Sequence, residues 1–190
     1  MDLQNAKIQK AFDWLAKENG SDFLMSDEYC QTRDVFGARL SRITSEMEKM
    51  ELLKETYALL AAIVGEIGNN AFDHNLGSWR DVPGIYFAYD LEKKFIVIAD
   101  RGQGLLATLK RVAPELKTEN QAIMLAFTKV ISGRAPEKRG NGLKFVESTV
   151  RKYKLKVYFY SNDGAYVVNE GLHVGEASQN LKGVLAVINF

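Results

Sequence analysis

Cysteine, histidine and proline are scarce in this chain. Its 190 residues include one cysteine, two histidines and three prolines. The single cysteine, Cys30, excludes an internal disulfide framework, and with two histidines it falls short of the four ligands that a structural zinc site needs. The rest of the composition, 46% hydrophobic and 26% charged, is typical of a globular protein that can bury a core without covalent staples.

The chain also lacks a large excess of positive or negative charge, a signal sequence and a long hydrophobic run. Its formal net charge is +1, which gives no strong attraction to nucleic acid or to acidic lipids. The first residues are not a basic stretch followed by an apolar one, and no apolar run approaches the length of a membrane span. We therefore expect a cytoplasmic protein with no membrane span and no nucleic-acid partner.

The first quarter of the chain has the periodicity of helices. Its first apolar face comprises Ile8, Ala11, Phe12 and Leu15. A second helical stretch, from about residue 27 to residue 50, carries apolar residues at alternating steps of four and three: Phe36, Leu40, Ile43, Met47 and Met50. This is the spacing of a coiled-coil seam, although it covers only two heptads. We interpret residues 1–51 as a helical extension whose seam either packs on its own domain or forms a homodimer or partner interface.

Residues 52–190 have the mixed pattern of an α+β domain. A helical stretch from Leu52 to His74 is followed by two β-rich runs, Gly84–Asp90 and Lys94–Asp100, joined by a short turn. The second run is apolar on both faces, so we expect it in the centre of a sheet. Further strands are expected at residues 154–161, 165–169 and 183–189, and further helices at residues 104–112, 118–130 and 143–152. The predicted fold is a two-layer α/β sandwich, in which helices cover one face of a mixed, mostly antiparallel sheet.

The helix that ends near His74 carries a polar stripe beside its apolar one. Glu66, Asn70 and Asp73 lie four and three residues apart, so they share one helical face, with His74 at its margin. Polar groups at the edge of a buried face need hydrogen-bond partners, which a bound ligand with a metal ion would supply. An ordinary solvated helix face would show the same pattern.

Two glycine-containing segments further along the chain also suit ligand binding. Asp100 ends the central strand and can accept a hydrogen bond from an exocyclic amine, while Gly102 and Gly104 let the backbone approach a flat base closely. The second segment precedes the last helix, where free backbone N–H groups and the helix dipole attract anions. Its residues expected near an anion are Lys138, Arg139, Gly140, Asn141, Gly142 and Leu143. Each segment alone is also typical of an ordinary turn or loop.

In their order, the three motifs resemble the N, G1 and G2 boxes of the Bergerat-fold (GHKL) ATPases. This family joins gyrase, heat-shock chaperones, sensor histidine kinases, mismatch-repair ATPases and anti-sigma-factor kinases. The resemblance covers about residues 52–190, and the pattern is closest to the histidine kinase-like ATP-binding domains of anti-sigma-factor and sensor kinases. It implies that the protein binds ATP and Mg²⁺.

The resemblance also implies a role for each matching residue. Asn70 would hold Mg²⁺, Asp100 would bind the adenine amino group, and Glu66 would act as the general base. Gly102 and Gly104 would line the adenine pocket, and residues 105–139 match the mobile ATP lid. The other implied nucleotide contacts come from Asp73, His74, Lys138, Arg139, Gly140, Asn141, Gly142 and Leu143.

Three functions stay open within this resemblance. We favour a regulatory kinase that transfers the γ-phosphate to a partner protein, because residues 1–51 contain no histidine that could serve as an internal acceptor. The alternatives are a non-catalytic interaction module gated by ATP and a slow ATPase. Phosphate transfer, tight binding without turnover, and phosphate release would distinguish the three.

Overall fold

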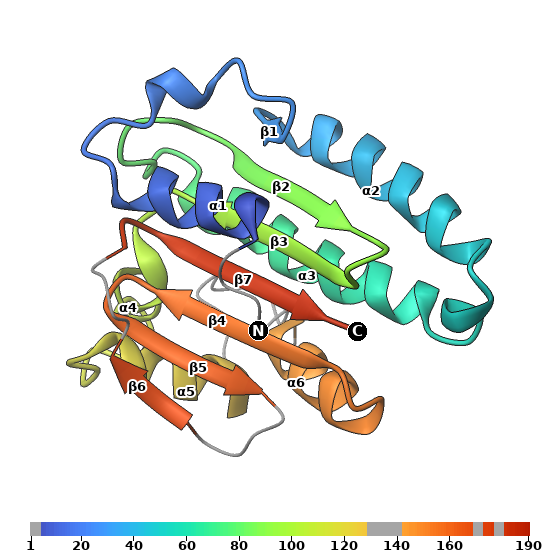
Figure 1. The fold of residues 1–190 in the computed structure, drawn as a ribbon. Coiled ribbons are helices and arrows are strands. Elements are labelled where there is room, and N and C mark those ends of the chain that lie inside the picture. The colour runs from blue at the N-terminus through green and yellow to red at the C-terminus, as the bar shows by residue number, and fades with distance from the viewer. Residues whose placement is uncertain (1–4, 129–141, 169–172, 177–180) are drawn as a thin grey trace.

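A seven-stranded sheet forms the centre of the computed structural model, which describes residues 5–128, 142–168, 173–176 and 181–190 (Figure 1). The strand order is β1-β2-β3-β7-β4-β5-β6, and every described pair of neighbours is antiparallel. The α+β class is confirmed, but the sheet expected to be mixed is antiparallel wherever it is described. The strands are β1 (Tyr29–Cys30), β2 (Ile85–Asp90), β3 (Phe95–Asp100), β4 (Lys156–Ser161), β5 (Gly164–Val168), β6 (His173–Glu176) and β7 (Val184–Asn189).

Most of the described helices cover one face of this sheet. They are α2 (Arg33–Glu48), α3 (Tyr57–Asn75), α4 (Gly104–Leu109), α5 (Glu119–Thr128) and α6 (Gly142–Lys152). Their apolar stripes meet the sheet in one continuous core, in which Ile63 of α3 and Val150 of α6 are fully buried with Ile96 of β3. This helix layer on a sheet gives the two-layer sandwich that the sequence predicts.

The opposite face of the sheet is partly covered by α1 (Ala6–Ala16). Figure 1 shows this helix lying across the strands on the side away from α3. Ile8, Trp14 and Leu15 of α1 are buried in a second core with Val97 and Val187 of the sheet. The sequence analysis placed α1 in the helical extension without assigning it to a surface, because an amphipathic stripe predicts burial without saying which surface provides it.

The apolar seam of the second helix packs within the chain. Phe36, Ile43 and Met47 of α2 are buried in the same core as α3. A Cβ atom added to Gly68 of α3 would lie 2.3 Å from the ring of Phe36, so the two helices approach closely at a glycine. Two 3₁₀ turns, Ser21–Phe23 and Glu51–Leu53, connect α1, α2 and α3. The described part of residues 1–51 thus supplies an edge strand and two helices to the same sheet and cores.

The central strand β3 presents apolar side chains to both cores. Ile96 and Ile98 belong to the core under the helices, whereas Phe95, Val97 and Ala99 belong to the core under α1. Because side chains alternate along a strand, the next two residues continue this pattern. Asp100 therefore lies on the helix-covered face, and Arg101 lies on the α1 face. Among the described residues, no helix is long and apolar enough to cross a membrane.

Candidate functional site

A pocket lies at the end of β3, where α3, α4 and α6 come together. About 420 Å³ of space free of protein atoms lies in the pocket and its opening to solvent. Its lining residues are Ile67, Asn70, Ala71, His74, Asn75, Asp100, Gly104, Leu105, Thr108, Leu143, Phe159 and Val184. All three motifs singled out in the sequence thus contribute to one pocket.

Asp100 is the buried charged group of this pocket, with 4% of its surface exposed. Its Oδ1 accepts hydrogen bonds from the Asn75 side-chain amide at 3.0 Å and from the Gly102 backbone N–H at 2.9 Å. Both hydrogen bonds described for this carboxylate use Oδ1. Its second oxygen, Oδ2, therefore stays available to a donor that enters the pocket.

Burial changes the acidity of this carboxyl group. Removal from water raises the pKa of Asp100 to about 7, while the hydrogen bonds from Gly102 and Asn75 and the positive charge of Arg80 act in the opposite direction. Near neutral pH the group therefore exchanges between a carboxylic acid and a carboxylate. A donor hydrogen-bonded to Oδ2 would favour the carboxylate.

Asn75 is a site residue that the sequence analysis missed. It is 4% exposed, and its Oδ1 accepts the backbone N–H of Gln103 at 3.1 Å while its amide donates to Asp100. A Cβ atom on Gly102 would lie 2.1 Å from Nδ2 of Asn75, so this glycine provides space for the asparagine. Asn75 follows Ile67 and Ala71 at steps of four. A polar residue continuing the apolar stripe of a helix was the signal that could have revealed it.

Gly104 begins α4 at a position where a side chain would not fit. Its φ is +81°, and an added Cβ atom would lie 2.2 Å from Nδ2 of Asn162. The first N–H groups of α4 find partners outside the helix: Leu105 donates to Oγ of Ser161 at 2.9 Å, and Leu106 donates to Oε2 of Glu119 at 3.0 Å. Contacts with residues distant in the sequence therefore fix α4 at the pocket.

The carboxylate of Glu119 organises these contacts. It is 6% exposed and also accepts a hydrogen bond from the Ser161 hydroxyl at 2.8 Å. In the expected lid, residues 105–128 form α4, α5 and their connection, and Ile123 and Phe127 of α5 are fully buried. The rest of that expected lid, residues 129–139, lies outside the described residues.

The start of α6 lies beside the polar stripe of α3. A Cβ atom on Gly142 would lie 2.4 Å from Oε2 of Glu66 and 3.7 Å from Nδ2 of Asn70. Glu66 is exposed, and Asn70 lines the pocket together with Leu143. The sequence-predicted residues Lys138, Arg139, Gly140 and Asn141 lie outside the described part of the chain.

Asp73 and His74 have different surroundings, although they are adjacent in the sequence. Asp73 forms an ion pair with Arg33 of α2, and it is not among the residues that line the pocket. His74 does line the pocket, and its backbone carbonyl accepts the Gln103 side-chain amide at 2.9 Å. The shared helical face of Glu66, Asn70 and Asp73 thus extends from the start of α6 to α2.

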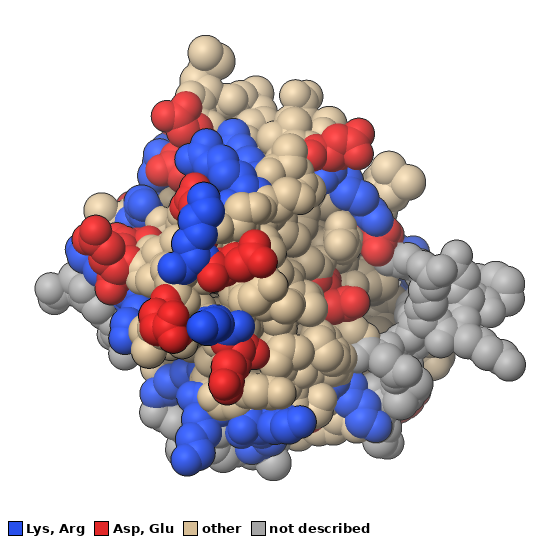
Figure 2. All heavy atoms as spheres, turned by 90° about the vertical axis from the view of Figure 1, so that its right-hand side faces the viewer, with Lys and Arg blue, Asp and Glu red and all other residues tan. Residues whose placement is uncertain are grey.

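The described residues offer few ligands for a metal held by protein alone. No group of three or more His, Cys, Asp or Glu side chains with suitable spacing occurs among them. Mg²⁺ needs only one or two protein ligands when a nucleotide supplies phosphate oxygens, so the amide oxygen of Asn70 is compatible with it. On the face drawn in Figure 2, cationic and anionic side chains are interspersed, so neither sign dominates the electrostatic potential of that face.

No protein-family model and no curated protein matches this chain. The chemistry of the pocket is therefore inferred from its own residues. It combines a hydrogen-bond acceptor at a buried strand end with apolar walls and the amide of Asn70. The acid Glu66 lies beside the start of α6 but is not among the residues that line the pocket.

Proposed function

We propose that this protein binds ATP with Mg²⁺ in the pocket at the end of β3 and acts as a regulatory phosphotransferase of the Bergerat-fold type. The observation that carries the proposal is the convergence of the three motifs. The buried carboxylate of Asp100, the amide of Asn70 and the start of α6 at Leu143 all line one pocket, although Asn70 and Leu143 lie far apart in the sequence.

The Asp100 end of the pocket suits a flat base with an exocyclic amine. Oδ2 of Asp100 would accept a hydrogen bond from such an amine, while Asn75 and Gly102 hold Oδ1. Leu105, Phe159 and Val184 line the same pocket and provide apolar surface for the faces of a base. An adenine ring offers both the amine and the flat apolar faces.

The other end of the pocket suits phosphate groups with a metal ion. The first N–H groups of α6, an eleven-residue helix, have no partners within the helix itself, and its N-terminus carries the positive end of the helix dipole. Asn70 would contribute one oxygen ligand to Mg²⁺, which would neutralise charge on the phosphates. Glu66, exposed and close to Gly142, could take a proton from an attacking hydroxyl, imidazole or water.

Phosphate transfer to another protein is the favoured activity within this proposal. Residues 1–51 contain no histidine that could accept the phosphate, which is compatible with an acceptor on a partner. A module gated by ATP, or a slow ATPase, would use the same pocket. The exposure of Glu66 is compatible with an incoming acceptor group and with water.

Calorimetry with ATP and Mg²⁺ tests the binding proposal. We expect saturable binding by the unaltered protein and a loss of about tenfold or more in affinity for Asp100→Asn, because the amide presents a donor to the adenine amine. Equal titrations of the two proteins, or no binding by either, would refute the proposal.

The activity is tested with Glu66→Gln, whose binding of ATP should be retained. We expect phosphate transfer to a partner, or phosphate release, to fall about 100-fold or more, which is the usual contribution of a general base. Tight binding by the unaltered protein without either activity would instead identify the ATP-gated module.

A further inference from the structure

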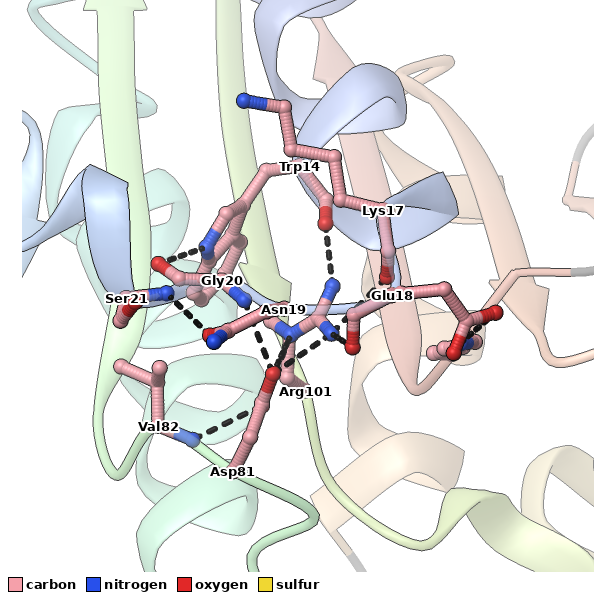
Figure 3. Close-up of polar contacts among 10 residues, drawn as sticks. Trp14, Lys17, Glu18, Asn19, Gly20, Ser21, Asp81, Val82 and Arg101 are labelled. Carbon is pink, nitrogen blue, oxygen red and sulfur yellow. Dashed lines mark hydrogen bonds and ion pairs between the residues drawn. The ribbon is translucent and has the colours of Figure 1, made fainter.

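A fully buried arginine follows Asp100 directly in the chain. Arg101 has 0% of its surface exposed and lies on the opposite face of the sheet from Asp100, under the end of α1. Figure 3 shows its guanidinium enclosed by the end of α1, the segment that follows α1, and Asp81. A buried guanidinium needs a partner for each of its donors, so its contacts show what holds it there.

Asp81 neutralises this buried charge. Nε of Arg101 donates to Oδ1 of Asp81 at 2.8 Å, and its terminal NH2 donates to Oδ2 at 2.7 Å, the paired geometry that suits a guanidinium and a carboxylate. Asp81 also accepts backbone N–H groups from Gly20 at 2.9 Å and Val82 at 2.8 Å. Burial opposes ionisation of Asp81, but the hydrogen bonds from Arg101, Gly20 and Val82 lower its pKa overall.

The remaining donors of Arg101 bind the end of α1. They reach the backbone carbonyl of Trp14 and those of Lys17, at 3.0 Å, and Glu18, at 3.2 Å. The last carbonyls of a helix lack partners within the helix and carry partial negative charge, so a cation stabilises them. A Cβ atom on Gly20 would lie 2.7 Å from Cδ of Arg101, which shows how closely the chain wraps this side chain.

The backbone between Arg101 and the pocket leaves little freedom of movement. The carbonyl of Arg101 accepts the backbone N–H of Arg80 at 3.2 Å. A Cβ atom on Gly183, the residue before β7, would lie 1.9 Å from the carbonyl oxygen of Asp100, so this glycine closely approaches the end of β3. One residue further, the N–H of Gly102 holds Oδ1 of Asp100. A shift of the Arg101 backbone would therefore displace both the carboxylate and its donor.

We propose that Arg101 is a positioning residue for the pocket: by clamping the end of α1 and Asp81 on one face of the sheet, it fixes Asp100 on the other face and couples the docking of α1 to ligand affinity. The inference rests on the proposed function in one respect, because the ligand whose affinity is measured is ATP. The coupling itself depends only on contacts within the chain, namely those of Arg101 with Asp81 and with Trp14, Lys17 and Glu18.

The test compares three variants of the full chain. Arg101→Met combined with Asp81→Asn removes one positive and one negative charge, so the net charge near Asp100 is unchanged. Val187→Ala, the matched control, creates a cavity in the same core without touching the clamp. Arg101→Lys keeps the charge but has three donors for the two carboxylate oxygens and three carbonyls that Arg101 contacts. All are compared at a temperature at which circular dichroism shows each to be folded.

Two quantities are measured for each variant. Calorimetry gives the dissociation constant for ATP with Mg²⁺, and ¹³C NMR gives the titration midpoint of the Asp100 carboxyl group. We expect the paired variant to bind about tenfold or more weakly, because small displacements of a binding group weaken its interactions strongly. We also expect its Asp100 midpoint to fall toward that of an ordinary aspartate, because a displaced carboxylate gains water. For Arg101→Lys we expect an affinity and an Asp100 midpoint between those of the paired variant and the unaltered protein. Val187→Ala should change neither quantity.

The proposal is overturned if the paired variant has the midpoint and affinity of the unaltered protein, or if Val187→Ala shows the same losses. Should the paired variant not fold, Arg101→Lys decides by the same two measurements. A failure of the nucleotide proposal gives a different result, in which the unaltered protein itself does not bind ATP. The Asp100 midpoint then decides alone whether Arg101 positions the strand end.

Discussion

The side-chain amide of Asn75 donates a 3.0 Å hydrogen bond to Oδ1 of Asp100, and this bond joins the last turn of α3 to the end of β3. Both side chains are 4% exposed. The carbonyl oxygen of the same amide accepts the backbone N–H of Gln103. The first two sequence motifs are therefore one hydrogen-bonded unit, and Asn75, which neither motif contains, is the residue that joins them.

Replacing Asn75 with alanine should weaken both the fold and the pocket. The change removes the donor to Asp100 and the acceptor for Gln103, which leaves a buried carboxylate and a half-buried backbone N–H without these partners. We expect a loss of about 1–3 kcal/mol in the free energy of unfolding, measured with urea. Asn69→Ala on the same helix, outside the pocket lining, is the control and should change the free energy much less. Equal losses for the two variants would contradict the role of Asn75.

The raised pKa of Asp100 gives the ligand-free protein a characteristic pH dependence. Between pH 3.8, the ordinary pKa of an aspartate, and the raised pKa of about 7, the folded protein binds a proton on Asp100 that the unfolded chain does not. The contribution of this group to the free energy of unfolding is therefore fully present below pH 3.8 and is lost as the pH rises toward 7. Asp100→Asn has no such group, and it keeps an acceptor oxygen for Asn75 and Gly102.

Asp100→Asn should consequently be more stable than the unaltered protein at pH 8, by about 1–4 kcal/mol, and similar to it near pH 4. Urea unfolding at the two pH values measures the difference. The comparison cancels other titrating groups, including Asp81, whose lowered pKa has the opposite effect on stability. A stability difference that is independent of pH would show that Asp100 titrates normally.

Ligand affinity should depend on the same titration with the opposite sense. If the carboxylate form accepts the adenine amine, binding competes with protonation of Asp100, whose pKa is about 7. Affinity for ATP should then fall by about tenfold for each pH unit below that pKa and level off above it. Calorimetry between about pH 5.5 and about pH 8.5 measures how the affinity depends on pH, because this range extends to both sides of the Asp100 pKa. Asp100→Asn should bind weakly at every pH, and a flat profile for the unaltered protein would contradict this mechanism.

The sequence predicted the parts of the site that follow from local pattern. Alternation in β3 and its apolar character on both faces indicated a central strand, and the structure confirms this with β2 and β7 on its two sides. Helical spacing likewise placed Asn70 and His74 along one helix, where both line the pocket. Such periodicities are set by neighbouring residues, so they can be read from the sequence without knowledge of the fold.

The contacts that complete the site depend on residues far apart in the sequence. Arg101 binds carbonyls 83–87 positions away, and Glu119 binds Ser161 across 42 positions. In the sequence, a buried arginine within a binding motif resembles a surface residue until its partners are known. The same limit explains why α1 was not assigned to the second face, and why the two-residue strand β1 was not expected.

Replacing two glycines with alanine should distinguish a position that requires glycine from one that tolerates a side chain. At Gly104, φ is +81°, and an alanine Cβ would lie 2.2 Å from Nδ2 of Asn162 and 2.8 Å from Oε1 of Glu119. Gly104→Ala should therefore destabilise the protein by about 1–2 kcal/mol from backbone strain alone, and by more if the Glu119 contacts that hold α4 are displaced.

Gly37 is exposed within α2, and an added Cβ would meet nothing within 4 Å. Gly37→Ala should stabilise the protein by about 0.5–1 kcal/mol, because alanine loses less backbone entropy in a helix. Urea unfolding measures both, and the inference about α4 fails if Gly104→Ala is as stable as the unaltered protein.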